Sequence, residues 1–320
     1  MKKEIGGYFQ LELREGKHFH EKAVKLNLGR TAFELLLEIN KYKKIYLPAY
    51  VCESVLEPVR KTETDYEFYN INEKLEPIFD KSLLPNEAFY YVNYFGIKND
   101  FIATGIKYGE QVIIDNAHAF FDSPQNGFET FYSARKFFGV PEGSYLYTSR
   151  KIEREITRGK SYDKAAHLLI RIDEGAEAGY KHFLENERKH SFAEIKRMSF
   201  LSEAILRNID YPTARRRRSE NFKFLHENLC KINEMTINLE ENASPLCYPL
   251  LIKSYGVREK LIENKIFVPI YWKDALIRDE LSNYEKYLTE NLLPLPVDQR
   301  YGKEEMDYIL KAIGEATSGK

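Results

Sequence analysis

Short apolar runs alternate with helical segments between residues 44 and 147, and this alternation restricts the possible folds more than any other feature. We expect strands at 44–47, 66–71, 88–95, 111–114, 130–133 and 144–147, with helices at 51–60 and 101–108. Alternation with short connections predicts an α/β fold, in which a mainly parallel sheet is flanked by helices. No G-x-G-x-x-G follows any of these strands, so a dinucleotide-binding Rossmann domain lacks its main sequence support.

The length of 320 residues exceeds the size at which one hydrophobic core usually stops growing, so two domains are expected. We predict a large α/β domain at 1–210, which begins with an irregular arm, and a smaller α+β domain at 211–320. Glycines interrupt the charged stretch at 162–190, which therefore predicts two helices. In the smaller domain we expect helices at 214–229, 257–263 and 304–315 and strands at 246–253 and 266–272.

The charge balance argues against two classes of partner. The formal net charge is −1, which disfavours nucleic acid or an anionic membrane surface as the main partner. The one basic cluster is the four-arginine run at 215–218. Because it lies in a helical pattern, we interpret it as a solvated helix face or a subunit contact.

Cysteine and histidine spacing predicts neither a disulfide framework nor a metal site. Cys52, Cys230 and Cys247 are far apart, which is typical of a reducing compartment. His18 and His20 have no cysteine or acid at a suitable spacing, so we expect surface histidines. The sequence begins without a signal-peptide pattern and holds no run of membrane-spanning length, so we expect a cytoplasmic protein.

A candidate site lies within residues 111–150. Asp115 ends one apolar run and His118 follows it, while the next expected strand ends at Ser133, shortly before Lys136. Open α/β sheets bind ligands at the carboxyl ends of their strands, so these four side chains should gather at one edge. Taken singly, the acid could cap a turn, the histidine could be a core residue and the lysine could lie on the surface.

A second candidate lies near the N-terminus. Gly29 precedes a segment of helical composition at 31–37. A glycine turn that leads into a helix presents free backbone N–H groups and the positive end of the helix dipole, and both suit a phosphate. Gly29, Arg30 and Thr31 are therefore candidate phosphate-binding residues, although glycines precede helices in many α/β proteins.

The motifs around this site resemble those of the DegT/StrS-type aminotransferases. The run 115–119 is similar to the family's D-x-A-[QH]-A, and Lys136, followed by residues 141–144, is similar to its lysine followed by G-E-G-G. Further likenesses, in chain order, join 27–32 to S-G-T-x-A, 47–50 to V-P-A-[FY], 92–96 to V-H-x-x-G, 197–199 to N-Y-R-M-S and 293–296 to L-P-L-[PH]. The ordered set covers nearly the whole chain.

The resemblance implies a fold-type I transferase that uses pyridoxal 5'-phosphate. Lys136 would be the Schiff-base lysine and proton shuttle, Asp115 would keep the pyridine nitrogen protonated, and His118 would lie beside the cofactor ring. The residues that would hold the phosphate are Gly29, Arg30, Thr31 and Ser133. The family usually places its serine five residues before the lysine, where this chain has Phe131, but other aminotransferases of the fold use the position of Ser133.

The reaction that the resemblance implies moves an amino group from an amino acid to a nucleotide-linked keto sugar or to a similar carbonyl compound. The enzyme that carries it out would be a homodimer. Several positions depart from the family pattern, namely Leu28, Cys52, Asn93 and Ile195. These departures leave open the alternative that the chain is a degenerate paralogue that binds the cofactor and has a structural or regulatory role. Another pyridoxal-phosphate reaction, such as dehydration, also stays open. A family member that dehydrates replaces the lysine by histidine, so Lys136 counts against that version.

Overall fold

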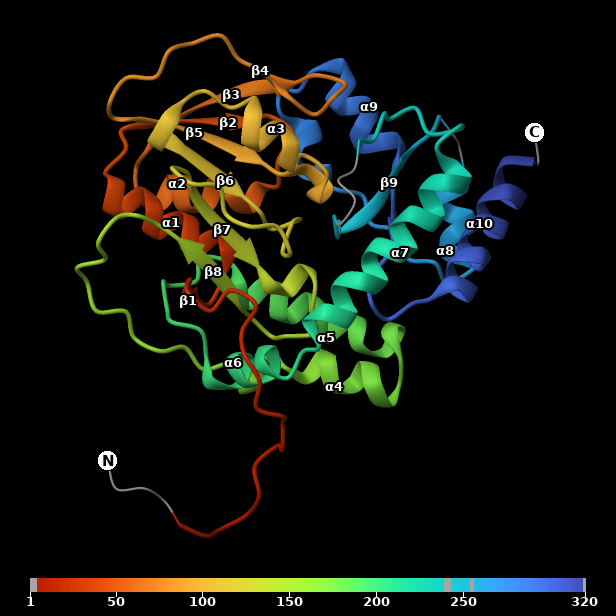
Figure 1. Ribbon diagram of the computed structural model, residues 1–320, viewed down its shortest axis with the longest axis horizontal. Coiled ribbons are helices and arrows are strands. Elements are labelled where there is room, and N and C mark those ends of the chain that lie inside the picture. The colour runs from red at the N-terminus through yellow and green to blue at the C-terminus, as the bar shows by residue number, and fades with distance from the viewer. Residues whose placement is uncertain (1–4, 239–242, 254–255, 319–320) are drawn as a thin grey trace.

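The computed structural model describes residues 5–238, 243–253 and 256–318. Eight strands form one sheet in the order β1-β8-β7-β6-β5-β2-β3-β4 (Figure 1). Their bounds are β1 Val24–Leu26, β2 Lys44–Pro48, β3 Asp65–Ile71, β4 Pro77–Ile78, β5 Glu87–Val92, β6 Val112–Asp115, β7 Glu129–Ser133 and β8 Ser144–Tyr147. The neighbours from β7 to β3 pair in parallel, and β1, β8 and β4 pair antiparallel. The predicted mainly parallel sheet is confirmed.

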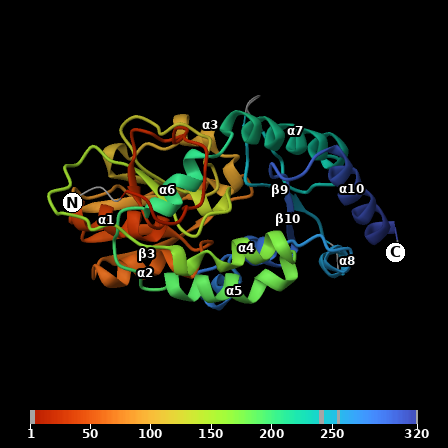
Figure 2. The same cartoon turned by 90° about the horizontal axis from the view of Figure 1, so that it is seen from below.

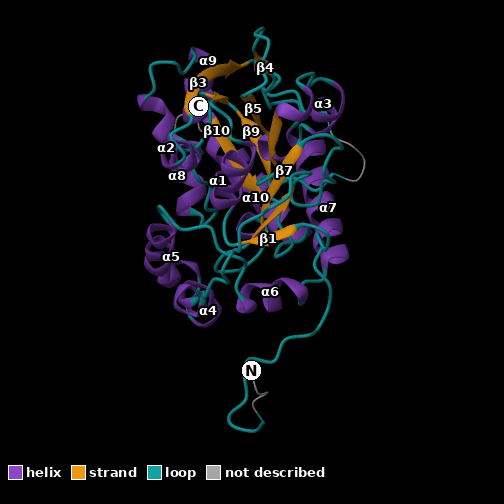
Figure 3. Ribbon diagram, turned by 90° about the vertical axis from the view of Figure 1, so that its left-hand side faces the viewer, coloured by secondary structure: helices purple, strands orange, loops and turns teal. Residues whose placement is uncertain are grey.

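Helices cover both faces of this sheet. Figure 3 shows α1 (Gly29–Asn40) and α2 (Leu56–Lys61) on one side and α3 (Asn99–Thr104) on the other. The central strand β5 is buried along its whole length, because it has strands on both edges and helices on both faces. The next helices in the chain are α4 (Ala166–Asp173), α5 (Ala176–His190) and α6 (Phe200–Arg207).

The C-terminal part builds a small antiparallel sheet from β9 (Cys247–Leu251) and β10 (Leu292–Pro296). Its helices are α7 (Tyr211–Leu229), α8 (Val257–Glu263), α9 (Asn283–Asn291) and α10 (Lys303–Ser318). Figure 2 shows the small sheet with α7 on one side and the α4–α5 pair on the other. The helix α7 begins where the domain boundary was predicted, and Asp210 caps it by accepting from the Thr213 N–H. The two-domain division itself stays a prediction.

The expected strand at 266–272 is wrong. Ile266 and Val268 are buried and Phe267 is exposed, which is the alternation that predicts a strand, but no neighbouring strand pairs with them in the described chain. Pro269 also lacks an N–H for a ladder. The partner of β9 is instead β10, which contains two prolines and carries no β-branched residue, so its composition does not indicate a strand.

His18 and His20 are not the surface histidines that we expected. They are 9% and 2% exposed. The His20 Nε2–H donates to the Phe120 carbonyl at 2.7 Å, and Nδ1 then accepts from the Tyr147 hydroxyl at 3.2 Å. His18 Nδ1 is hydrogen-bonded to the Tyr145 hydroxyl at 2.7 Å. Burial lowers the pKa of both rings to about 4.

These two histidines should make the protein sensitive to mild acid. In the unfolded chain a histidine takes up a proton near its ordinary pKa of 6.5, whereas the folded rings resist protonation until about pH 4. Stability from this source is complete above pH 6.5 and is lost as the pH falls toward 4. For His20 the loss between pH 7 and pH 5 is on the order of 2 kcal/mol. We expect the fall in Tm from pH 7 to pH 5 to be smaller in His20→Gln than in the wild type. An equal fall in both proteins would contradict this.

No helix in the described ranges combines the length and apolar character that crossing a membrane requires. The same residues contain no group of three or more His, Cys, Asp and Glu side chains that could hold a metal ion.

Candidate active site

The candidate site is built at the carboxyl ends of neighbouring parallel strands. Val92 at the end of β5 pairs with Asp115 at the end of β6, and Asp115 pairs with Phe131 in β7. The chain therefore delivers Asp115 and Ser133 to the same edge. The strand order reverses at the β5–β2 boundary, which is where open α/β sheets bind ligands.

Asp115 is held rigidly in this edge. Only 8% of its surface is exposed. The Tyr90 hydroxyl donates to Oδ2 at 2.7 Å, and the Ala117 N–H donates to Oδ1 at 2.8 Å. Burial raises the pKa of the carboxyl, and the bonds from Tyr90 and Ala117 and the charge of Lys136 oppose that rise. The carboxylate is thus fixed in place, and each oxygen retains a lone pair for a further donor.

Lys136 ends a 3-10 turn, Ala134–Lys136, that follows β7. Its side chain is exposed in the single chain, yet desolvation is the first cause that lowers the pKa of its amine. Both observations hold if protein surrounds the amine on most sides and one side opens to water. Cys52 and Asp115 raise this pKa and Arg135 and Arg30 lower it, with the net direction downward. A lowered pKa increases the neutral fraction of the amine, which is the nucleophilic form.

Arg135, directly before Lys136, does not join the site. Its guanidinium forms an ion pair with Glu187 on α5. Successive side chains of a 3-10 turn point about 120° apart, which separates the Arg135 side chain from that of Lys136.

Ser133 lies beside the start of α1. A Cβ added to Gly29 would lie 3.9 Å from the Ser133 Cβ and 3.4 Å from the Phe131 ring. The Ser133 hydroxyl has no hydrogen-bond partner in the part of the chain that the structure describes, and the side chain is half-buried. Phe131, at the position where the family usually has its serine, stacks instead against Phe33 of α1. Of these two, only Ser133 carries a hydroxyl next to the helix N-terminus.

The side chains of Arg30 and Thr31 have protein partners. Arg30 forms an ion pair with Glu57 at 2.7 Å. The Thr31 hydroxyl donates to Asn27 Oδ1 at 2.6 Å and accepts from the Leu28 N–H at 3.2 Å. These bonds fix the first turn of α1, so the anion site here would rest on backbone N–H groups and the dipole. Cofactor contacts by Gly29, Arg30 and Thr31 stay predictions.

His118 is enclosed by aromatic rings. It is 4% exposed and stacks on Trp272 with an interplanar angle of 4° and on Phe95 with an angle of 23°. Burial, and next the charge of Lys136, lower its pKa to about 3, so the ring is neutral at pH 7. Phe95 and Trp272 have φ values of 58° and 53°, which is strained for bulky residues and is characteristic of functional sites.

Two buried arginines hold the loops of this edge, and we expected neither of them to be buried. Arg278 donates to the carbonyls of Ala49 and Val51, both at 2.7 Å, and so fixes the segment that carries Tyr50 and Cys52. Arg218, within the run expected on the surface or at a subunit contact, is 1% exposed and donates to the Phe137 carbonyl directly after Lys136. The interpretation of the arginine run is therefore wrong for Arg218.

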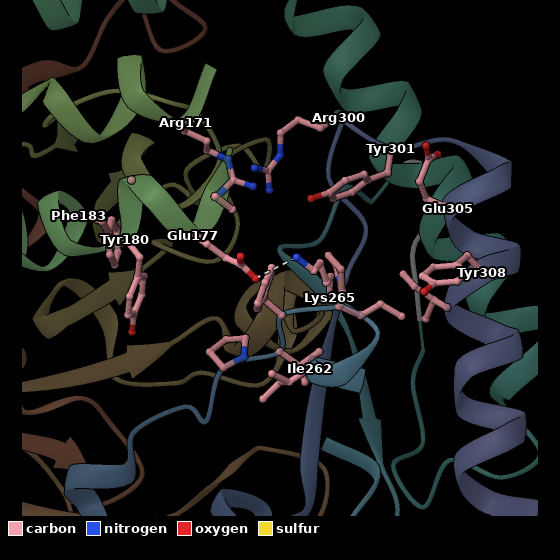
Figure 4. A pocket seen from close by; sticks show the side chains of 18 of the residues that line it. Arg171, Glu177, Tyr180, Phe183, Ile262, Lys265, Arg300, Tyr301, Glu305 and Tyr308 are labelled. Atoms are coloured by element: carbon pink, nitrogen blue, oxygen red, sulfur yellow. Dashed lines mark ion pairs between the residues drawn. The ribbon is translucent and has the colours of Figure 1, made fainter. Parts of the chain in front are cut away.

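A cavity of about 730 Å³ opens between the α4–α5 pair and the C-terminal part (Figure 4). Its walls include Tyr180 and Phe183 of α5 and Tyr308 of α10. An ion pair between Glu177 and Lys265 spans it at 3.3 Å (Figure 4). None of the predicted site residues lines this cavity.

Comparison with solved structures shows what this arrangement resembles. The sugar aminotransferase CalS13 from Micromonospora echinospora matches over 94% of this chain and 88% of its own, with a TM-score of 0.65 and 12% identity. A DegT DnrJ EryC1 StrS aminotransferase from Brucella abortus matches over 94% and 90%, with 0.64 and 14%. NtdA from Bacillus subtilis, with bound cofactor PMP, matches over 92% and 73%, with 0.62 and 13%.

This chain has the fold of the sugar aminotransferases. The expected fold-type I architecture is thereby confirmed. No protein-family model and no curated protein matches the sequence.

Proposed function

We propose that the chain is an aminotransferase that uses pyridoxal 5'-phosphate and moves an amino group from an amino acid to a keto sugar. One observation carries the proposal: Asp115 ends β6 and Lys136 follows the adjacent strand β7 in a sheet with the sugar-aminotransferase fold, and the charge of each affects the pKa of the other. A fixed acid, an amine with a lowered pKa and a helix N-terminus are the groups that this cofactor requires.

The bound cofactor would supply an electron sink for a carbanion at the amino-bearing carbon of the substrate. Asp115, anchored by Tyr90 and Ala117, would hold a proton at the ring nitrogen. Lys136 would bond to the cofactor aldehyde and, once displaced, would move a proton at its Nζ. The start of α1 and the Ser133 hydroxyl would bind the phosphate.

The test adds pyridoxal phosphate to the purified protein and then supplies L-glutamate as the amino donor. Binding should give a long-wavelength absorption band and an adduct that borohydride fixes to the chain. Glutamate should then remove the band as the amino group is transferred. A band without any response to a series of amino acids would favour the cofactor-binding paralogue. Absence of both band and adduct would refute the proposal.

The acceptor that we propose is a keto sugar, because the structural neighbours include sugar aminotransferases, and we further propose that the sugar is nucleotide-linked. We further propose a cytoplasmic location, which is supported by three cysteines that are all free.

We also propose a homodimer whose partner chain closes the site, because most homo-oligomers are two-fold dimers. Ile195 stands at the position where the resembled family often has an asparagine that reaches the phosphate bound by the partner subunit. Its side chain is 5% exposed and packs in the core of its own chain. We expect a stable dimer by sedimentation. Because the apolar Ile195 side chain cannot bind a phosphate, we also expect cofactor to dialyse away more readily than in a family member with asparagine. A monomer at micromolar concentration would contradict the first expectation, and cofactor retained through dialysis against free phosphate would contradict the second.

A further inference from the structure

The N-terminal arm carries apolar side chains that the described part of its own chain leaves exposed. Ile5, Tyr8 and Phe9 are 94%, 98% and 93% exposed, and Leu11 is 65% exposed. Residues 5–13 make no hydrogen bond or ring contact with the rest of the described chain. Figures 1 and 3 show the arm leaving the body of the molecule. Apolar side chains gathered on an exposed segment indicate a binding surface.

The base of the arm is held by contacts with the rest of the chain, so the free part of the arm begins at a defined residue. The Arg14 N–H donates to Asn208 Oδ1 at 3.0 Å. A Cβ on Gly16 would lie only 2.4 Å from the Arg207 carbonyl oxygen, so only glycine fits at that point. His18 and His20 are buried immediately afterwards. The free part is therefore residues 5–13, which can reach about 30 Å when extended.

This base is packed on the loops of the candidate site. Phe19 contacts Phe120 and Phe121, just after His118. Those two rings in turn contact Phe137, the residue after Lys136. A second chain that closes over the site would therefore lie within reach of the arm.

One side of the site faces solvent in a single chain, because residue Lys136 is exposed although its amine is desolvated on the other sides. Chemistry at a lysine amine is favoured when water is excluded. In a two-fold dimer, each copy can place its apolar arm on the site of the other copy. The symmetry then forms the same contact twice, so both sites are covered. We propose that residues 5–13 of each copy cross to a second copy of this chain and cover the open edge of its site, with Tyr8 and Phe9 as the main contacts. The inference rests on the proposed site and dimer.

The first test measures self-association by sedimentation for the wild type and for Tyr8→Ser/Phe9→Ser. Loss of two large apolar contacts at each of two arms should weaken the dimer by more than roughly tenfold. The matched control is Ile78→Ser/Leu84→Ser, since these side chains are each 60% exposed and Ile78 lies in β4, at the opposite end of the sheet order from β1. The control should associate as the wild type does. Wild-type association of the arm variant, or equal weakening in the control, would overturn the proposal.

The second test asks in which chain the arm acts. Lys136→Ala with an intact arm is mixed and re-equilibrated with Tyr8→Ser/Phe9→Ser, which keeps Lys136. Only a mixed dimer with crossed arms combines a lysine and a wild-type arm in one site. At protein concentrations high enough for all species to be dimeric, random mixing then restores about a quarter of the wild-type sites. The readout is transfer activity together with borohydride-fixed cofactor on the Lys136 chain. No recovery would show that the arm folds over its own site, which overturns the exchange.

The two proposals fail in different ways. If the wild type forms no cofactor adduct, the proposed function is refuted, while the sedimentation comparison still decides whether the arm joins two copies. If the adduct forms but the arm variant associates normally, the function stands and the arm proposal is overturned.

Discussion

Lys136→Ala should eliminate the covalent link to pyridoxal phosphate and all detectable amino transfer. Among the described residues, Lys136 is the lysine whose charge acts on the Asp115 carboxyl, and its amine has the lowered pKa that a nucleophile needs. The fold should remain intact, because the side chain is exposed and forms no ion pair with the described residues. The measurement is the absorption spectrum with added cofactor, followed by borohydride reduction and mass analysis of the chain.

The matched control is Lys160→Ala, which removes another exposed lysine and should leave the adduct unchanged. Unfolding curves of both variants should overlay that of the wild type. An adduct that survives in Lys136→Ala would identify a different lysine as the anchor and would refute the assigned role.

The main architecture was predictable from sequence because its signals are local. Short apolar runs with short connections define strands such as β5 and β6, and a sheet with helices on both faces follows from their alternation. The gathering of Asp115, Ser133 and Lys136 at one edge follows from that topology alone, since parallel strands end on the same side. The aromatic enclosure of His118 by Trp272 could not be foreseen, because that contact joins residues far apart in the chain.

The errors concern polar residues whose burial depends on tertiary partners. His18 and His20 lie in a polar stretch, and Tyr145, Tyr147 and the Phe120 carbonyl supply the hydrogen-bond partners that their buried rings need. The burial of Arg218, unlike that of the two histidines, could have been predicted from the sequence. Arg218 lies on the same stripe of α7 as the buried residues Ala214, Phe222, Leu225 and Leu229. Helical spacing places an arginine on that buried face, and the charge run around it concealed the pattern.

The side chain of Thr31 illustrates a further limit. A hydroxyl in the first turn of a helix suits either a phosphate or the helix cap, and sequence does not distinguish them. In the structure the hydroxyl bonds to Asn27 and Leu28. Leu28 has no side-chain acceptor for the N–H groups of the first turn, and Thr31 makes the reciprocal bond of a capping box by accepting from the Leu28 N–H.

Asp115→Asn should still form the cofactor adduct but lose amino transfer by several orders of magnitude, since a neutral amide cannot hold the ring nitrogen protonated. The Tyr90 hydroxyl and the Ala117 N–H should keep the new side chain in place. A graded companion is Tyr90→Phe, which removes the hydroxyl that lowers the pKa of Asp115. The pKa of the carboxyl then rises further, so the acid limb of the pH–rate profile should move to higher pH. Near-normal turnover by Asp115→Asn, or an unmoved acid limb in Tyr90→Phe, would contradict the role that we assign to this carboxylate.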